Sequence, residues 1–189
     1  MNPVTTDLGS TLLKLAREAI AHHLGLGEPP RTDDDPRLHE RGATFVTLTL
    51  DGELRGCIGS LRRQRKLGED VITNAVAAAF KDPRFPPLSR QEFDDVHVEV
   101  SLLSEPEFIE FSDEADLLGK LRPHQDGLIL FAGCGSATFL PQVWEQLPEP
   151  RAFLAALKRK AGMPQDRPVD GLMAARYAVD KWEEAPGEA

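Results

Sequence analysis

The sequence predicts an α+β protein with a mainly antiparallel sheet and flanking helices. Two pairs of strand-like segments, at 44–59 and 128–140, are each joined by a short turn, and such hairpins build antiparallel sheets. Helical patterns are scattered between the strands and do not alternate with them one by one, as they would in a parallel α/β fold. The length of 189 residues fits one compact domain, or one with a minor lobe.

The chain begins with a predicted amphipathic helix. Apolar residues recur with helical spacing over residues 8–24, and Gly25 and Gly27 followed by two prolines end the pattern. The next stretch, residues 28–36, is polar and contains several Asp and Pro residues. This composition is typical of a loop.

The first hairpin is predicted from its turn. Asp51-Gly52 lies between two β-branched, alternating segments, and a type I′ turn favours this dipeptide because both of its central positions need positive φ. A two-residue turn then sets the pairing of the strands, which is Leu50 with Glu53, Leu48 with Arg55 and Val46 with Cys57. In that register Arg55 and Cys57 lie on the same face of the sheet.

Signals of the same kind predict the rest of the fold. The first of these elements are a helix at 68–80, a stiff loop at 82–88 imposed by its prolines, and a short helix after the capping-box spacing of Ser89 to Glu92. A strand at 96–103 and a helix from Ser112 to about Leu121 follow. After the second hairpin come a short helix from Pro141, a helix at 149–161 and a last strand at 176–182. Acidic residues at the start of the 68–80 helix suit the positive end of its dipole.

Composition and motifs exclude several classes of function. The chain carries 22 Lys and Arg against 31 Asp and Glu, a formal charge of −9, which opposes binding to nucleic acid phosphates. No apolar run approaches the roughly 18 residues of a membrane span, and the first residues lack the pattern of a signal peptide. Cys57 and Cys134 lie far apart and form no CxxC pair, so we expect a reducing compartment without a zinc site or disulfide framework. Metal-ligand spacings and nucleotide-binding motifs are absent from the sequence, so neither a metal nor a cofactor is predicted.

Positive charge is concentrated in one part of the chain. From Arg55 to Arg90 there are eight basic and three acidic residues, which gives a local charge of +5 and leaves −14 for the rest. A basic island in an acidic protein favours the binding of a small anionic molecule there. For the run at 62–66 we favour the alternative that these charges lie on a solvated loop.

Cys57 is the principal candidate for chemistry. Gly56 and Gly59 flank it, and residues without a Cβ let backbone or ligand approach the thiol closely. A guanidinium on the same face, from Arg55, would favour the thiolate. The alternative is that Cys57 simply packs in the interior, as most free cysteines do.

His97 and Glu99 alternate on one face of a predicted strand. An imidazole and a carboxylate could act on a thiol as the base and its orienting acid, as in cysteine hydrolases. The same alternation is equally typical of the solvated face of a half-buried sheet. His39 and His124 lie in polar loops and are interpreted as surface residues.

The hexapeptide LRGCIG at 54–59 resembles the signature of the AMMECR domain family, whose prokaryotic members are called AmmeMemoRadiSam system protein A. Further blocks agree in order, at 42–48, 82–88, 99–104, 127–130, 140–144 and 160–162. The resemblance covers residues 8–183, so the chain is interpreted as a single AMMECR-like domain followed by a flexible tail at 184–189. The turn at 122–127 departs from the family pattern, which leaves His124 without a family role.

The resemblance implies a two-lobed α+β fold with lobes of unequal size and the LRGCIG segment near a cleft between them. It also implies a cytoplasmic protein whose functional partners are a Memo-like protein and a radical SAM protein. The family has no established activity, so the resemblance carries over the site and not a reaction.

Two hypotheses follow. In the first, the protein is an enzyme, or the substrate-binding component of a small enzyme system, that acts on a small anionic substrate through Cys57 as the catalytic residue. The residues expected to contact that substrate are Arg55, Gly56, Gly59, Arg84, Glu99 and Lys160. In the second, it is a non-catalytic protein-interaction module in which the stiff loop at 82–88 is a docking surface.

Arg84 has two possible roles within that loop. Its guanidinium could be presented to a carboxylate or phosphate of a ligand, because the neighbouring prolines restrict the backbone. It could instead pair with Asp82 and stabilise the loop, which is the commoner outcome for neighbouring charges.

Overall fold

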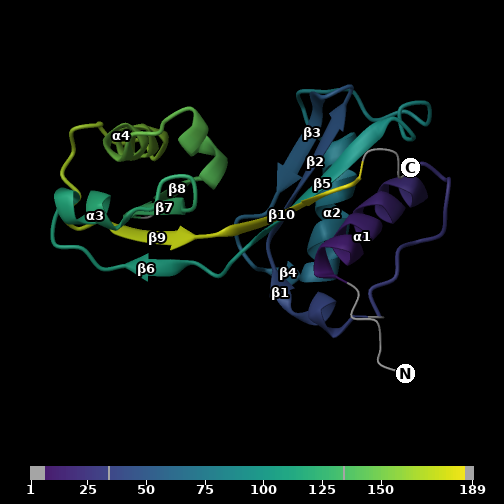
Figure 1. Cartoon of the computed structure of the whole chain (residues 1–189), viewed down its shortest axis with the longest axis horizontal. Coiled ribbons are helices and arrows are strands. Elements are labelled where there is room, and N and C mark those ends of the chain that lie inside the picture. Colours follow the sequence, from purple (N-terminus) through teal and green to yellow (C-terminus); the bar gives the residue numbers. More distant parts are fainter. Residues whose placement is uncertain (1–6, 34, 134, 186–189) are drawn as a thin grey trace. The chain divides into compact units, whose positions relative to one another are not determined.

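A computed structural model describes residues 7–33, 35–133 and 135–185 of the chain (Figure 1). The chain divides into two compact units, residues Met1–Leu103 with Asp180–Ala189, and residues Ser104–Val179. Cys134, and positions 186–189 of the predicted tail, lie outside the described residues. Within those residues no helix is both long and apolar enough to span a membrane.

The first unit is built on a four-stranded sheet in the order β10-β5-β2-β3. Its strands are β10 (Val179–Glu183), β5 (Val96–Leu103), β2 (Thr44–Leu50) and β3 (Glu53–Gly59), and β2 pairs antiparallel with both β3 and β5. Two helices, α1 (Leu8–His23) and α2 (Leu67–Phe80), pack on this sheet. A short 3-10 helix, η1 (Pro36–His39), and the two-stranded pair of β1 (Arg41–Gly42) and β4 (Arg65–Lys66) complete the unit.

Only one face of this sheet contacts the helices. Val46 of β2 and Val98 of β5 are fully or almost fully buried against α1 and α2, and each such side chain stabilises the fold by about 1.5–3 kcal/mol. Trp182 of β10 packs on the same core, over Gly9 of α1. Because side chains alternate along a strand, Thr47 and Glu99 lie on the opposite face.

The second unit is a four-stranded sheet in the order β6-β9-β7-β8. Its strands are β6 (Glu107–Ile109), β9 (Met173–Tyr177), β7 (Gly127–Ala132) and β8 (Gly135–Phe139), all paired antiparallel. The helices are α3 (Glu114–Lys120), the 3-10 helix η2 (Pro141–Glu145) and α4 (Pro150–Lys160). Trp144 of η2 stacks on Phe153 of α4 with ring centroids 3.7 Å apart, at the centre of a second core.

The predicted α+β class, the antiparallel pairing and the longer helices are confirmed, with local differences. The predicted strand at 176–182 is two strands, β9 and β10, because the chain passes there from the sheet of one unit to that of the other. The predicted helix at Ser89 is a series of turns, although Ser89 and Glu92 do form the reciprocal capping hydrogen bonds. Only seven residues separate Leu88, which is anchored to the Ala79 carbonyl, from β5, too few for a helix and its exit.

Candidate functional site

The register of β2 and β3 differs from the prediction. Leu50 pairs with Glu53 as expected, but a β-bulge follows, and the pairs beyond it are Leu48 with Gly56, Thr47 with Cys57 and Val46 with Ile58. The predicted pairs of Leu48 with Arg55 and Val46 with Cys57 are therefore wrong. A bulge inserts one residue into a strand and moves every later side chain to the other face of the sheet. Cys57 thus lies on the face of Thr47, away from α1 and α2.

Arg55 is the extra residue of this bulge, so the regular alternation from which a shared face with Cys57 was predicted is interrupted there. Its buried guanidinium donates from Nε to Glu92 Oε1 at 2.8 Å and from Nη2 to Oε2 at 3.2 Å. Such a two-pronged ion pair fixes both partners. Arg55 therefore joins β3 to the 89–95 turn. A contact of Arg55 with a ligand stays a prediction.

Cys57 is half-buried and is held at three of its atoms. The Thr47 hydroxyl donates to its Sγ at 3.3 Å. Its N–H donates to Asp82 Oδ2 at 2.9 Å, and its carbonyl accepts from Arg84 Nη2 at 3.3 Å. The backbone around the thiol is thereby fixed by the Asp-Pro-Arg segment that follows α2.

Arg84 pairs with Asp82, which is one of the two roles considered for it. The buried Asp82 carboxylate accepts from the Arg84 backbone N–H at 3.1 Å, from Nε at 3.0 Å and from Nη2 at 2.7 Å. Arg84 is the main cause that holds the pKa of Asp82 well below its usual range, and Asp82 in turn raises the pKa of Arg84. The Arg84 side chain is nevertheless 53% exposed. It therefore pairs locally and still presents charge to solvent beside Cys57.

The two glycines beside Cys57 are required by packing inside the unit. A Cβ on Gly56 would lie 2.2 Å from the carbonyl oxygen of Ala78 in α2. A Cβ on Gly59 would lie 2.2 Å from the ring of Phe45. What approaches the LRGCIG strand closely is thus the α2 backbone on one face and an aromatic ring on the other. Ligand contacts at these glycines remain a prediction.

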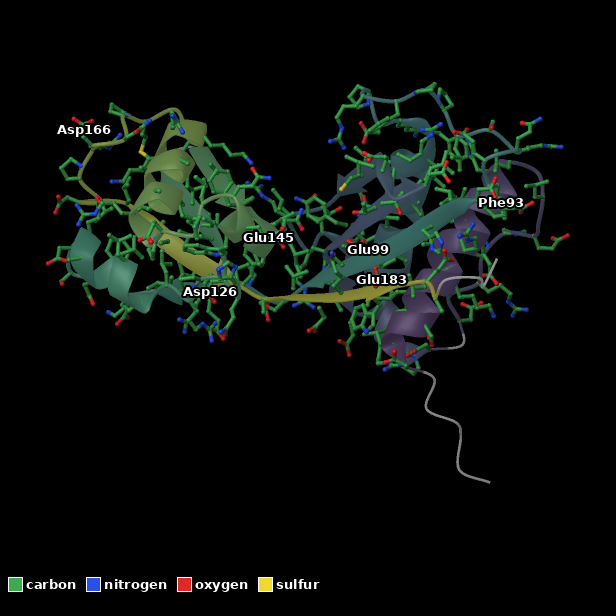
Figure 2. All side chains as sticks on the ribbon, turned by 45° about the horizontal axis from the view of Figure 1, so that its top comes forward. Phe93, Glu99, Asp126, Glu145, Asp166 and Glu183 are labelled. Atoms are coloured by element: carbon green, nitrogen blue, oxygen red, sulfur yellow. The ribbon has the colours of Figure 1, made fainter. Side chains whose placement is uncertain are left out.

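Glu99 lies in the same row as Cys57, with Thr47 between them. Thr47 pairs with Cys57 on one side and with Glu99 on the other, which places the two outer Cα atoms about 10 Å apart. The Glu99 carboxylate accepts from Lys181 Nζ at 2.8 Å. In Figure 2 Glu99 and Glu183 mark the neighbouring strands β5 and β10. His97 is exposed and opposite Thr49, so His97 and Glu99 share a face as predicted but are both separated from the thiol by β2.

Comparison with known proteins identifies the family. The AMMECR1 family model matches residues 13–182. The chain belongs to the AMMECR1 family. A protein of Methanothermobacter thermautotrophicus is 41% identical over 171 residues, covering 87% of each chain. The crystal structure of the uncharacterized protein PH0010 from Pyrococcus horikoshii is similar in fold, with a TM-score of 0.79, 36% identity and coverage of 93% of this chain and 91% of that one.

The remaining site residue of this AMMECR1 chain, Lys160, belongs to the second unit. Its Nζ donates to the Thr138 carbonyl at 3.0 Å and lies 5.1 Å from the centre of the Phe139 ring. These contacts anchor the end of α4 to β8. Within the described residues no group of three or more His, Cys, Asp or Glu side chains is placed to hold a metal ion.

Sequence reasoning missed Thr47 and Lys181 as parts of the site. Thr47 meets Cys57 only because of the bulge, and Lys181 meets Glu99 only because β10 lies beside β5. Asp82 was recognised as a partner for Arg84 but not for the Cys57 backbone. The signal available for it was the Asp-Pro-Arg sequence, since Asp commonly accepts from the N–H two residues later.

The Arg55–Glu92 pair predicts a loss of stability in acid. Arg55, together with the Ser89 N–H, lowers the pKa of Glu92 from 4.5 to about 2. A carboxyl with a lowered folded-state pKa stabilises the protein above its unfolded pKa, and this contribution disappears as the pH falls from about 4.5 towards 2. We expect Glu92→Gln to be destabilised by about 1–2 kcal/mol at pH 6 and progressively less below pH 4.5. Urea unfolding at a series of pH values measures the difference in stability between the unsubstituted protein and the variant, with a substitution at an exposed residue, Glu53→Gln, as control. A difference that does not change with pH would contradict the prediction.

Proposed function

We propose that this AMMECR1-family protein binds a small anionic molecule beside Cys57 and that the thiol reacts with it or contacts it directly. The observation that carries the proposal is the arrangement of Asp82. This single buried carboxylate holds the Cys57 backbone on one side and the half-exposed Arg84 guanidinium on the other. A thiol and a cation are thereby kept in a fixed relation on one unit.

Arg84 is suited to recognise a carboxylate or a phosphate. Its Nε and Nη2 are occupied by Asp82 and the Cys57 carbonyl, whereas Nη1 makes no hydrogen bond within the part of the chain that the structure describes. A guanidinium held in this way loses little conformational freedom when an anion binds, which favours affinity. Thr47 orients the thiol from the opposite side through its hydroxyl.

The wider role is proposed from the family resemblance. A Memo-like protein and a radical SAM protein would supply or consume the anionic molecule in the cytoplasm. Glu99, with Lys181 beside it, offers a polar group at the far end of the Cys57 row for a second part of such a molecule. Gly56 and Gly59 are further candidate contacts for this molecule.

Alkylation with a charged and a neutral reagent tests the proposal. In a Cys134→Ser background, we expect the ratio of the iodoacetate to the iodoacetamide rate at Cys57 to fall about 2–5-fold on Arg84→Gln. An exposed charge beside the thiol contributes about 0.5–1 kcal/mol to the approach of an anion. Inorganic phosphate at millimolar concentration should slow the labelling of Cys57 in the unsubstituted protein and not in the Arg84→Gln variant. Mass spectrometry of the Cys57 peptide measures both effects.

The chain provides a matched control. The tripeptide Asp35-Pro36-Arg37 repeats Asp82-Pro83-Arg84, and there too the guanidinium contacts its aspartate, at 2.6 Å. Arg37→Gln removes the same charge and the same type of local pair, so the alkylation ratio should not change. An equal ratio in the unsubstituted and Arg84→Gln proteins would reject the proposal. A Cys57 thiol that reacts no faster than that of a free peptide would exclude the reacting role.

Rejection would favour the second candidate, a protein-interaction module. The specific observation for it is that Pro83, Pro86 and Pro87 are exposed on a loop anchored at both ends, by Asp82 and by the Leu88 N–H to the Ala79 carbonyl. A rigid surface of this kind loses little entropy on binding a partner.

A further inference from the structure

The second unit carries an exposed apolar cluster on the face of its sheet that is turned away from α4. Phe108 of β6 is 66% exposed and Met173 of β9 is 57% exposed. Phe131 of β7 connects them, because it pairs with Met173 and its ring centroid lies 5.7 Å from that of Phe108. We call these three residues the Phe108 patch. Contiguous exposed apolar side chains of this kind mark interaction surfaces.

The patch lies at a free sheet edge. β6 occupies the end of the strand order, pairs with β9 on one side, and has no strand on its other side within the described residues (Figure 1). An edge strand offers backbone donors and acceptors to an extended segment, which can add to the sheet as a further strand. Side chains at alternate positions of such a segment would point onto the Phe108 patch.

The charge around this edge indicates what kind of segment it fits. From Glu105 to Asp116 the chain carries six acidic residues and no Lys or Arg. On and next to β6 these are Glu107, whose side chain is 72% exposed and lies 3.4 Å from Arg176 Nε, and Glu110, which is also exposed. A second copy of this edge would bring like charges together, whereas a basic segment would be complementary.

We propose that β6 and the Phe108 patch form a docking site for an extended segment of a partner protein that carries Lys or Arg residues and apolar residues at alternate positions. The alternative role for the acidic residues is to protect the edge from aggregation. Protection alone does not account for a two-thirds-exposed phenylalanine on the strand itself, since edges are protected by removing such side chains. This site is independent of the function proposed for Cys57, because it lies wholly in the second unit.

Peptide selection on the full chain tests the proposal. From a displayed library of random peptides we expect enrichment of sequences in which basic and apolar residues alternate. A fluorescein-labelled peptide of the enriched sequence should bind at least 10-fold more weakly to Phe108→Ser, the loss typical of a central aromatic contact. Glu107→Lys with Glu110→Lys should weaken binding and reduce its dependence on salt. Fluorescence anisotropy measures each affinity.

Two controls distinguish binding at the Phe108 patch from non-specific binding to exposed apolar side chains. Leu26→Ser removes an exposed apolar side chain of the first unit, 47% exposed, and should leave binding unchanged. Thermal melting should show that the Phe108→Ser protein is folded, as expected for a side chain that is mostly in solvent. Enrichment of acidic peptides, no enrichment, or equal binding to the Phe108→Ser protein would overturn the proposal. So would sedimentation that shows a dimer disrupted by Phe108→Ser, because the occupant would then be a second copy.

Discussion

Replacing Gly56 with alanine is expected to lower the free energy of unfolding of the first unit by about 3 kcal/mol. The added Cβ would lie 2.2 Å from the Ala78 carbonyl oxygen and 3.1 Å from its carbonyl carbon. Both are backbone atoms of α2, so no side chain can rotate away to make room. β3 and α2 must separate, which loosens the apolar contacts of Ile58, Val71 and Ala75 in the core.

Hydrogen exchange followed by mass spectrometry measures this effect in each unit separately. Protection of α2 and β3 should fall by about 100-fold, since 1.4 kcal/mol corresponds to a factor of ten, while α4 should keep its protection. Gly119→Ala is the matched control, because it is an exposed position of α3 and its Cβ would meet nothing within 4 Å. That variant should be neutral or slightly stabilised. Normal protection of α2 in the Gly56→Ala protein would show that the close approach is not required.

The fold could be predicted where a single local signal decides an element. The apolar period of α1 and the Asp51-Gly52 turn each act within a few residues, and the structure has the corresponding elements. The split of the last strand into β9 and β10 could not be predicted, because the alternation of residues 176–182 continues through the break. Only the sheet that each half joins distinguishes them.

The site could be predicted in its residues better than in its geometry. Cys57 and Arg84 were both recognised, and the structure brings them together through Asp82. Arg55 was placed beside the thiol because a regular hairpin was assumed. At the bulge, Arg55 pairs with Glu92, a residue 37 positions away, and Gly56 lies against the α2 backbone. Neither contact can be recognised from a local sequence pattern. A shift of one residue is nevertheless enough to move every later side chain of the strand to the other face of the sheet.

Asp82 links the stability of the first unit to its proposed chemistry. Its carboxylate accepts hydrogen bonds from the Cys57 N–H and from three nitrogens of Arg84. Asparagine has the same shape but carries a donor NH₂ in place of one acceptor oxygen. Both oxygens of Asp82 accept hydrogen bonds, so in either orientation of the amide its NH₂ would face an N–H donor. We therefore expect Asp82→Asn to lose about 1–3 kcal/mol of stability, the cost of leaving buried hydrogen-bond donors without their acceptor. Urea unfolding at pH 7 measures it.

Two further readouts separate this role of Asp82 from a merely local one. The pKa of Asp82 is lowered in the folded state. The carboxylate therefore stabilises the fold above its ordinary pKa of about 3.8, and this stabilisation is lost as the pH falls below that value. The difference in stability between the unsubstituted protein and the Asp82→Asn variant should accordingly narrow as the pH falls below 4. The variant should also lose the preference of Cys57 for iodoacetate although Arg84 is still present, because the guanidinium is no longer fixed. Asp35→Asn, in the matching tripeptide, breaks the contact with Arg37 and should leave the alkylation ratio unchanged. If Asp82→Asn destabilises the protein but keeps the iodoacetate preference, Arg84 finds the anion without its carboxylate partner, and the fixed geometry proposed for the site is wrong.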